Sequence, residues 1–280
     1  MLVYERDGRF VRAWGEGAFT ERTHGITIGP DDTVYCVDDA DHSVRSFTID
    51  GEQRMTLGTR GRASDTGYDG AAYATIARAG PPFNRPTNLA VAPNGDLYVT
   101  DGYGNARVHQ FAADGTLIRS WGAPGGGRGE FRIPHGICIL ADGRVLVADR
   151  ENDRIQVFDL DGGFLEEWLD IQRPTQLAIG PDGLIYVSEL WWQKGQRSHR
   201  LGEIAADRYG RVSAIRSDGT VVGRWGGSPP GTPGAFTAPH GIAVDSRGDV
   251  YVAEVTYTIG VATGRIPAGA APTLQKLARG

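Results

Sequence analysis

Residues 134–168, PHGICILADGRVLVADRENDRIQVFDLDGGFLEEW, contain one complete copy of the unit from which this chain is built. Two short alternating runs, residues 145–149 and 154–158, lie between the turns Asp142-Gly143 and Asp161-Gly162. Asp-Gly between such runs favours a tight hairpin, because both central residues of the turn adopt positive φ. With one strand before the first turn and one after the second, the unit is predicted to form four short antiparallel strands.

The unit occurs five times. The copies begin near Thr23, Pro86, Pro134, Pro174 and Pro239, at spacings of 63, 48, 40 and 65 residues. A repeat of about 40 residues with four strands is typical of a β-propeller blade. The longer spacings are explained by inserted loops at residues 59–82, 122–130 and 191–211. We therefore predict an all-β chain in which residues 1–280 form a single propeller domain.

Residues 1–17 resemble only the second hairpin of the unit. We therefore expect a six-bladed β-propeller in which the first half of one blade is missing at the N-terminus. A half blade leaves an unpaired sheet edge, which is unfavourable. For that reason a longer natural chain, with Met1 as an internal residue, is favoured over a two-stranded remnant.

One position of the unit alternates between histidine and threonine. His24, His135 and His240 occupy it in the first, third and fifth copies, and Thr87 and Thr175 occupy it in the others. If the repeats are arranged radially, alternate blades direct three imidazoles toward one axis. Three imidazoles that leave a fourth position open are typical of a catalytic zinc site. The alternative is that the imidazole merely fills a turn before the strand, but the strict alternation favours a metal site.

Two turns and two of these histidine motifs give the chain a family resemblance. They are DGYGNARV at residues 101–108, ADRENDRIQ at residues 148–156, Pro134-His135 and Pro239-His240. The units resemble NHL repeats, and the whole constellation, over about residues 2–255, resembles the peptidyl-α-hydroxyglycine α-amidating lyases, which are six-bladed propellers. The resemblance implies an enzyme that splits the N–C bond of a carbinolamide to give a peptide amide and glyoxylate.

The resemblance also implies roles for individual residues. The three histidines would bind a catalytic zinc, Tyr103 would be the catalytic tyrosine, and Arg150 would be an active-site arginine. The arginine that holds the substrate carboxylate in the lyases belongs to the half blade missing here. Gly241 replaces an acid that helps to bind calcium, so calcium is not expected. Ala238 replaces a methionine, and the disulfides of the lyases have no counterpart, since Gly104 follows the tyrosine.

Four further residues are candidates for substrate binding. Glu189 and Glu254 replace the aspartate that ends the second strand in other copies, and they either face the central mouth or are solvated or turn-capping carboxylates. Arg197 and His199 lie in the basic, aromatic segment 191–200. That segment either lines the mouth and binds an anionic substrate or forms a subunit contact.

Composition restricts the class of partner. The formal net charge of −5 argues against nucleic acid, because phosphate binding requires a basic surface. No run of 18 apolar residues and no signal-peptide core occur, so neither a membrane partner nor export is expected, and a cytoplasmic location is predicted unless a later start hides a signal peptide. Cys36 and Cys138 lie in strand-like runs and are interpreted as buried thiols.

Three functions remain open from the sequence. The first is a zinc-dependent lyase that acts on an α-hydroxyglycine-like carbinolamide, either a peptide C-terminus or a small molecule. The second is a non-catalytic NHL scaffold that binds a protein or peptide. The third is a propeller hydrolase of the lactonase kind, although such sites use acidic and Asn ligands for calcium. The oligomeric state is not encoded in these patterns.

Overall fold

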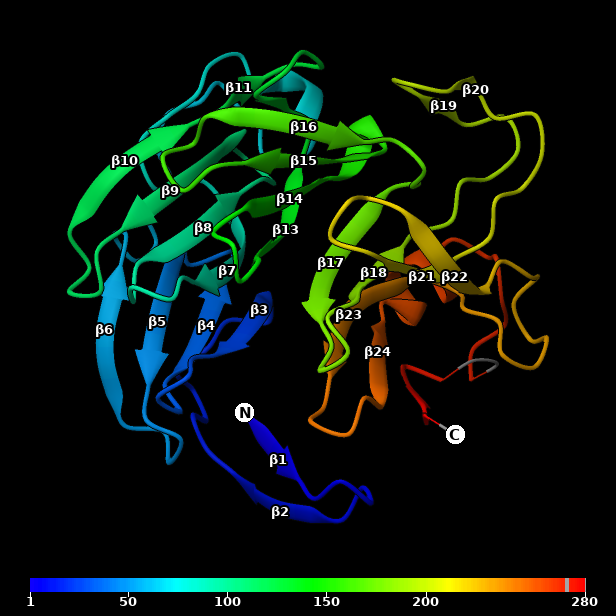
Figure 1. The fold of residues 1–280 in the computed structure, drawn as a ribbon, viewed down its shortest axis with the longest axis horizontal. Helices are drawn as coiled ribbons and strands as arrows, with labels where there is room; N and C mark the ends of the chain where they lie inside the picture. The colour runs from blue at the N-terminus through cyan, green and yellow to red at the C-terminus, as the bar shows by residue number, and fades with distance from the viewer. Residues whose placement is uncertain (270–271, 280) are drawn as a thin grey trace.

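The computed structural model describes residues 1–269 and 272–279. These residues form five antiparallel blades around a central axis, together with one hairpin (Figure 1). The first two blades contain β3 (Thr23–Ile28), β4 (Val34–Asp38), β5 (Ser43–Phe47) and β6 (Gln53–Leu57), then β7 (Pro86–Val91), β8 (Leu97–Asp101), β9 (Arg107–Phe111) and β10 (Leu117–Trp121). The third contains β13 (Pro134–Ile139), β14 (Val145–Asp149), β15 (Arg154–Phe158) and β16 (Phe164–Trp168). The prediction of an all-β propeller is confirmed.

The remaining two blades differ in size. The fourth contains β17 (Pro174–Ile179), β18 (Ile185–Glu189), β21 (Arg211–Ile215) and β22 (Val221–Gly226). The fifth has three strands, β23 (Pro239–Val244), β24 (Val250–Glu254) and β25 (Leu274–Leu277). Short strand pairs lie in two of the inserted loops, β11 (Ala123–Pro124) with β12 (Glu130–Phe131) and β19 (Arg197–Ser198) with β20 (Gly202–Glu203). No helix among the described residues is long and apolar enough to cross a membrane.

The ring lacks a complete sixth blade among the described residues, as the half unit at residues 1–17 predicts. Within the described residues there are five blades, and the hairpin of β1 (Leu2–Tyr4) and β2 (Phe10–Ala13) lies between the first and the fifth (Figure 1). Trp14, which follows the hairpin, packs on Phe47 of the first blade with ring centroids 5.3 Å apart. Arg6 in the hairpin turn forms ion pairs of 2.8 and 2.6 Å with Asp245 and Asp249 of the fifth blade. The hairpin therefore bridges the two ends of the ring.

The apolar core lies between neighbouring blades. Trp121 at the end of β10 packs on Phe158 of β15 with ring centroids 5.9 Å apart, and both belong to a cluster shared by the second and third blades. Similar clusters join the other consecutive blades, and one of them contains the buried free thiol of Cys138. The other free thiol, Cys36, is buried in a cluster between the first blade and the N-terminal segment. Because each blade buries its faces against its neighbours, pairwise packing sets the ring.

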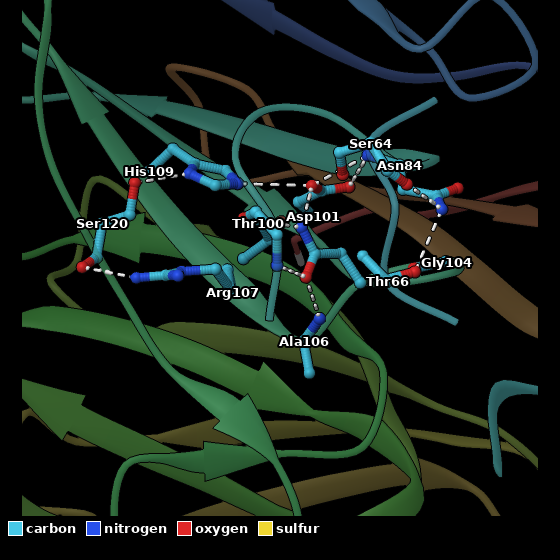
Figure 2. A network of polar contacts seen from close by, with 12 residues as sticks. Ser64, Thr66, Asn84, Thr100, Asp101, Gly104, Ala106, Arg107, His109 and Ser120 are labelled. Atoms are coloured by element: carbon cyan, nitrogen blue, oxygen red, sulfur yellow. Dashed lines mark hydrogen bonds and ion pairs between the residues drawn. The ribbon is translucent and has the colours of Figure 1, made fainter. Parts of the chain in front are cut away.

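A buried acid ends the second strand of every blade. In the second blade, Asp101 accepts a hydrogen bond from the backbone N–H of Asn84 at 3.0 Å, and His109 Nε2 lies 3.3 Å away (Figure 2). Asp101 also accepts from the Asn105 amide at 2.8 Å. The equivalent acids each accept a backbone N–H from the segment before their own first strand; they are Asp38, Asp149, Glu189 and Glu254. A buried carboxylate requires such partners, so this position is structural.

The alternating His/Thr position lies on the innermost strand of each blade. In β13 the pairing with β14 shifts register between Pro134 and Gly136, so His135 opposes no residue of β14. The first strands of the other blades shift register at the same place. A β-bulge redirects the side chain at the extra residue, here toward the axis.

Candidate metal centre and active-site cavity

Three histidines from alternate blades meet at the axis. The ring centroids of His24, His135 and His240 are separated by 4.6 to 5.1 Å. Ligand nitrogens from the three imidazoles all lie within 4.8 Å of one another. His135 is buried, whereas His24 and His240 are partly exposed. The group is compact enough to hold one metal ion with an open side toward solvent.

Two blades, the second and the fourth, carry threonine at the His/Thr position and are called the threonine blades; the other three are the histidine blades. Backbone carbonyls of the threonine blades orient two of the imidazole rings. His24 Nδ1 lies 2.6 Å from the Thr87 carbonyl oxygen, and His135 Nδ1 lies 2.8 Å from that of Thr175. A carbonyl oxygen only accepts, so each Nδ1 carries the proton and each Nε2 carries the lone pair. Metal-ligating histidines in proteins are held in this way.

The Tyr103 hydroxyl lies beside the Nε2 lone pairs of both His24 and His135. Its Oη is 3.0 Å from His24 Nε2 and 2.9 Å from His135 Nε2. A phenol has one proton and cannot donate to both nitrogens, so one Nε2 lacks a donor. A cation satisfies lone pairs that a hydroxyl leaves unmatched, and imidazole nitrogen is a preferred ligand of zinc. The donor set therefore fits a zinc ion.

The electrostatics of the centre keep the imidazoles neutral. Burial lowers the pKa of His24 to about 4, and it lowers the pKa of His135 and His240 well below the ordinary value. Burial also raises the pKa of Tyr103, opposed by the Arg150 guanidinium, whose carbon lies 5.5 Å from the tyrosine ring centre. Metal ligation requires unprotonated imidazoles, and these rings meet that requirement near neutral pH.

A cavity of about 290 Å³ opens over the histidines. One part of its wall is cationic and contains the guanidinium groups of Arg22, Arg150 and Arg173. Another part is apolar and contains Leu190, Val255 and Ile259. Tyr103, His24 and His240 also line the cavity, so the structure brings the predicted catalytic pair and two of the predicted ligands to one space.

Two carboxylates organise the cationic wall. Asp39 accepts from both Nε and Nη2 of Arg22 at 2.7 Å. Glu151 Oε1 accepts from Arg150 Nε at 2.9 Å and from Arg173 Nη2 at 2.8 Å. Because one carboxylate serves two guanidinium groups, Arg150, Arg173 and Glu151 together carry one net positive charge, and Glu21 is a further carboxylate of the cavity wall.

The structure does not bring Glu189 and Glu254 to the cavity. Glu189 is fully buried within its blade, where it accepts from Arg211 and Ser213 and from the backbone of Gln172. Glu254 accepts two backbone N–H groups before β23 and the Gln275 amide. Both are structural acids of the blades and do not face the central mouth. The extra methylene of glutamate leaves this role unchanged.

Arg197 and His199 are also placed away from the histidine centre. Arg197 is exposed on β19, and His199 Nε2 lies 3.0 Å from the hydroxyl of Tyr73, which belongs to another inserted loop. His199 and Tyr73 line a separate cavity of about 250 Å³ beside Arg132. The insert therefore contacts a second insert rather than the three histidines.

Arg22 and Arg173 were missed by the sequence reasoning. A signal for them exists, because arginine stands two residues before the His/Thr position in the first, second and fourth copies, as Arg22, Arg85 and Arg173. Arg173 adopts a left-handed backbone with φ of 33°, an unusual conformation for a non-glycine residue. The repeat alignment shows this arginine column, but only the fold shows that two of its members reach the cavity.

Comparison with known proteins agrees with this architecture. The NHL repeat profile matches residues 83–111, 131–158 and 236–258. NHL repeat-containing protein 3 of Homo sapiens is 30% identical over 273 residues, which cover 91% of this chain and 70% of that protein. This chain belongs to the NHL-repeat family.

Other relatives of this NHL-repeat protein carry enzyme names. Peptidyl-alpha-hydroxyglycine alpha-amidating lyase 1 of Drosophila melanogaster is 31% identical over 271 residues, which cover 89% of this chain and 45% of that protein. The chain thus spans about half the length of that relative. The solved structure of virginiamycin B lyase from Staphylococcus aureus is 15% identical with a TM-score of 0.54, and the match covers 83% of this chain and 63% of that one. This last likeness shows the propeller fold alone.

Proposed function

We propose that this NHL-repeat protein is a metal-dependent carbon–nitrogen lyase that cleaves an α-hydroxyglycine-type carbinolamide to an amide and glyoxylate. The observation that carries the proposal is the meeting of three imidazoles beside one cavity, which Tyr103 and Arg150 also line. The relatives named amidating lyases support the same reaction class. Zinc is the metal that we propose for the site.

The reaction requires proton transfer but no oxidant. The carbon–nitrogen bond breaks, the hydroxyl oxygen becomes the aldehyde oxygen of glyoxylate, the hydroxyl proton leaves, and the amide nitrogen gains a proton. A zinc ion bound by the three imidazoles would supply a Lewis acid that favours loss of the hydroxyl proton. Tyr103, whose Oη lies about 3 Å from two of the proposed ligand nitrogens, is placed to exchange a proton with substrate held beside them.

The walls of the cavity indicate which substrate it suits. The surplus positive charge shared by Arg150, Arg173 and Glu151 suits a substrate carboxylate, such as that of α-hydroxyglycine. The apolar wall suits the acyl group on the nitrogen. A volume of about 290 Å³ lies at the small end for ligand cavities, so we propose a small N-acyl-α-hydroxyglycine or the last residues of a peptide.

Metal analysis followed by a glyoxylate assay tests the proposal. The purified protein is expected to contain near-stoichiometric zinc and to release glyoxylate from an N-acyl-α-hydroxyglycine. His135→Ala is expected to remove both properties, whereas His199→Ala, which removes an exposed histidine outside the centre, is expected to keep them. A folded protein that holds little zinc regardless of His135 would refute the metal and favour the scaffold alternative. Zinc without glyoxylate release would refute the lyase reaction and leave the metal centre standing.

A lactonase function is less well supported by the donor set. Among the described residues, the three histidines form the one group of three or more potential metal ligands of this compactness. Carboxylate-rich calcium sites require oxygen ligands, which this group does not offer. Calcium is therefore not included in the proposal.

A further inference from the structure

The threonine blades have their own regular contacts with the histidine blades. Each threonine carbonyl accepts from the histidine of the preceding blade, as Thr87 does from His24 and Thr175 does from His135. The contacts join residues 63 and 40 positions apart in the chain. The alternation in the sequence is thus a physical link between successive blades around the axis.

A glycine after each of these two histidines makes the contact possible. A Cβ atom on Gly25 would lie 2.7 Å from the Thr87 oxygen, and one on Gly136 would lie 2.4 Å from the Thr175 oxygen. Real Cβ atoms do not approach so closely, so a side chain here would push the carbonyl away from the imidazole. Gly241, after His240, differs, because its nearest such neighbour is the Ala253 Cβ at 3.4 Å.

The threonine hydroxyls point forward to the next histidine strand. Thr87 Oγ1 lies 2.8 Å from the carbonyl oxygen of Pro134, directly before His135. Thr175 Oγ1 lies 3.3 Å from that of Pro239, directly before His240. Each threonine therefore contacts the histidine strand on both sides of it.

A second hydroxyl reinforces each threonine. Thr100 Oγ1 lies 2.9 Å from Thr87 Oγ1, and Ser188 Oγ lies 2.7 Å from Thr175 Oγ1. Ser188 also donates to the His240 carbonyl at 3.1 Å. The histidine blades carry no hydroxyl at this position, which they fill with Val37, Ala148 and Ala253. The hydroxyl pairs thus alternate in step with the histidines.

We propose that Thr87 and Thr175 are positioning residues of the metal centre: each carbonyl orients the histidine of the preceding blade, and each hydroxyl fixes the strand of the next. The inference rests on the proposed metal site and deepens it. It explains why copies without a ligand still carry a specific residue, and why Gly25 and Gly136 follow their histidines. Outer partners of metal-bound histidines typically change metal affinity about 10- to 100-fold when they are altered.

A pair of glycine variants tests the carbonyl contact. Gly136→Ala is expected to weaken zinc affinity about 10- to 100-fold, because the added methyl displaces the Thr175 carbonyl from His135. Gly241→Ala adds the same methyl after another proposed ligand but meets only ordinary contacts, and it is expected to stay within about threefold of wild type. The measurement is competition for zinc alone between protein and a chelator of known affinity. Equal affinities for the two variants would overturn the proposal.

Threonine variants test the hydroxyl contact and guard against misfolding. Thr87→Val and Thr175→Val keep the carbonyl and the shape, and each is expected to weaken zinc about 10-fold. Thr27→Val is the matched control, since Thr27 Oγ1 makes a similar inter-blade bond of 2.7 Å to the Leu89 carbonyl but does not contact the histidines. Thermal unfolding of the metal-free proteins identifies variants that fail to fold. If Gly136→Ala does not fold, the zinc affinities of Thr87→Val and Thr175→Val test the proposal instead. Zinc affinities equal to that of Thr27→Val would refute the role of the hydroxyls.

Failure of this inference is distinguishable from failure of the proposed function. If the wild-type protein binds no zinc, the metal centre and the positioning role of Thr87 and Thr175 are refuted together. If the wild-type protein binds zinc and all of these variants bind it equally well, only the positioning role is refuted.

Discussion

Glu151 is the residue whose removal tests the cationic wall most directly. Its side chain is 6% exposed and serves Arg150, which is 11% exposed, and Arg173, which is 18% exposed. Glu151→Gln introduces no steric clash with the two guanidinium groups, because the amide has the shape of the carboxyl group. The variant therefore removes one negative charge and leaves two positive charges close together in a largely buried place.

The size of the effect follows from this burial. Removing one partner from a buried ion pair costs about 3–5 kcal/mol. Since both arginines line a cavity that water reaches, we expect the lower end, about 3 kcal/mol of unfolding free energy. For a chain of this length, that loss corresponds to a fall in Tm of about 5 °C. Glyoxylate release is expected to fall as well, because Arg150 loses the group that orients it.

Urea unfolding of two matched variants measures the effect. Glu167→Gln makes the same substitution in the same blade, where Glu167 pairs with Arg154 at 2.9 Å but is 30% exposed. A pair at that exposure contributes about 1 kcal/mol or less, and Arg154 keeps its bond of 2.8 Å to Asp149. If Glu151→Gln and Glu167→Gln lose the same stability within about 1 kcal/mol, Glu151 does not neutralise a buried arginine pair. That result would refute the charge argument for the wall.

The tyrosine of the cavity, the two buried thiols and the N-terminal hairpin can each be tested separately. Tyr103→Phe is expected to lower the rate of glyoxylate release about 10²- to 10⁴-fold while zinc stays bound; unchanged turnover would remove Tyr103 from proton transfer. Burial raises the pKa of Cys138 to about 12 and that of Cys36 to about 11. At pH 8, iodoacetamide is therefore expected to label neither thiol until the protein unfolds. Fast labelling of the native protein would contradict the burial of these thiols. Arg6→Ala is expected to speed amide hydrogen exchange in residues 1–14 and to leave the midpoint of global unfolding nearly unchanged, because Arg6 pairs with Asp245 and Asp249 at partial exposure. Unchanged exchange would show that apolar packing alone holds the hairpin.

Local features of the sequence predicted the architecture well. The Asp-Gly turns and alternating runs encode hairpins directly, because turn chemistry and a two-residue period act over a few neighbouring residues. The first strands of the five blades begin at Thr23, Pro86, Pro134, Pro174 and Pro239, where the repeat alignment placed the copies. The five copies and the half unit likewise correspond to the five blades and the hairpin of the described residues. The sequence did not show that the hairpin is held by contacts with both ends of the ring.

The candidate site was only partly readable from the sequence. The His/Thr column identified three histidines because a repeat places equivalent residues at equivalent angles around an axis. The same logic left open whether Glu189 and Glu254 face the mouth or cap a turn, since the column shows that an acid recurs but not whether it faces solvent, the axis or a backbone N–H. Arg173 is found only when the fold shows that Glu151, from another blade, directs it to the cavity.

The sequence by itself determined the strands, the turns and the alternation of histidine with threonine. The tertiary structure alone decided which atoms those residues present to one another. The His24 to Thr87 and His135 to Thr175 bonds cross between blades, and so does the sharing of Glu151 by two arginines. Such contacts depend on the angle and spacing of whole blades, which are set by packing of apolar faces distant in the chain. The periodicity of the sequence does not specify that packing.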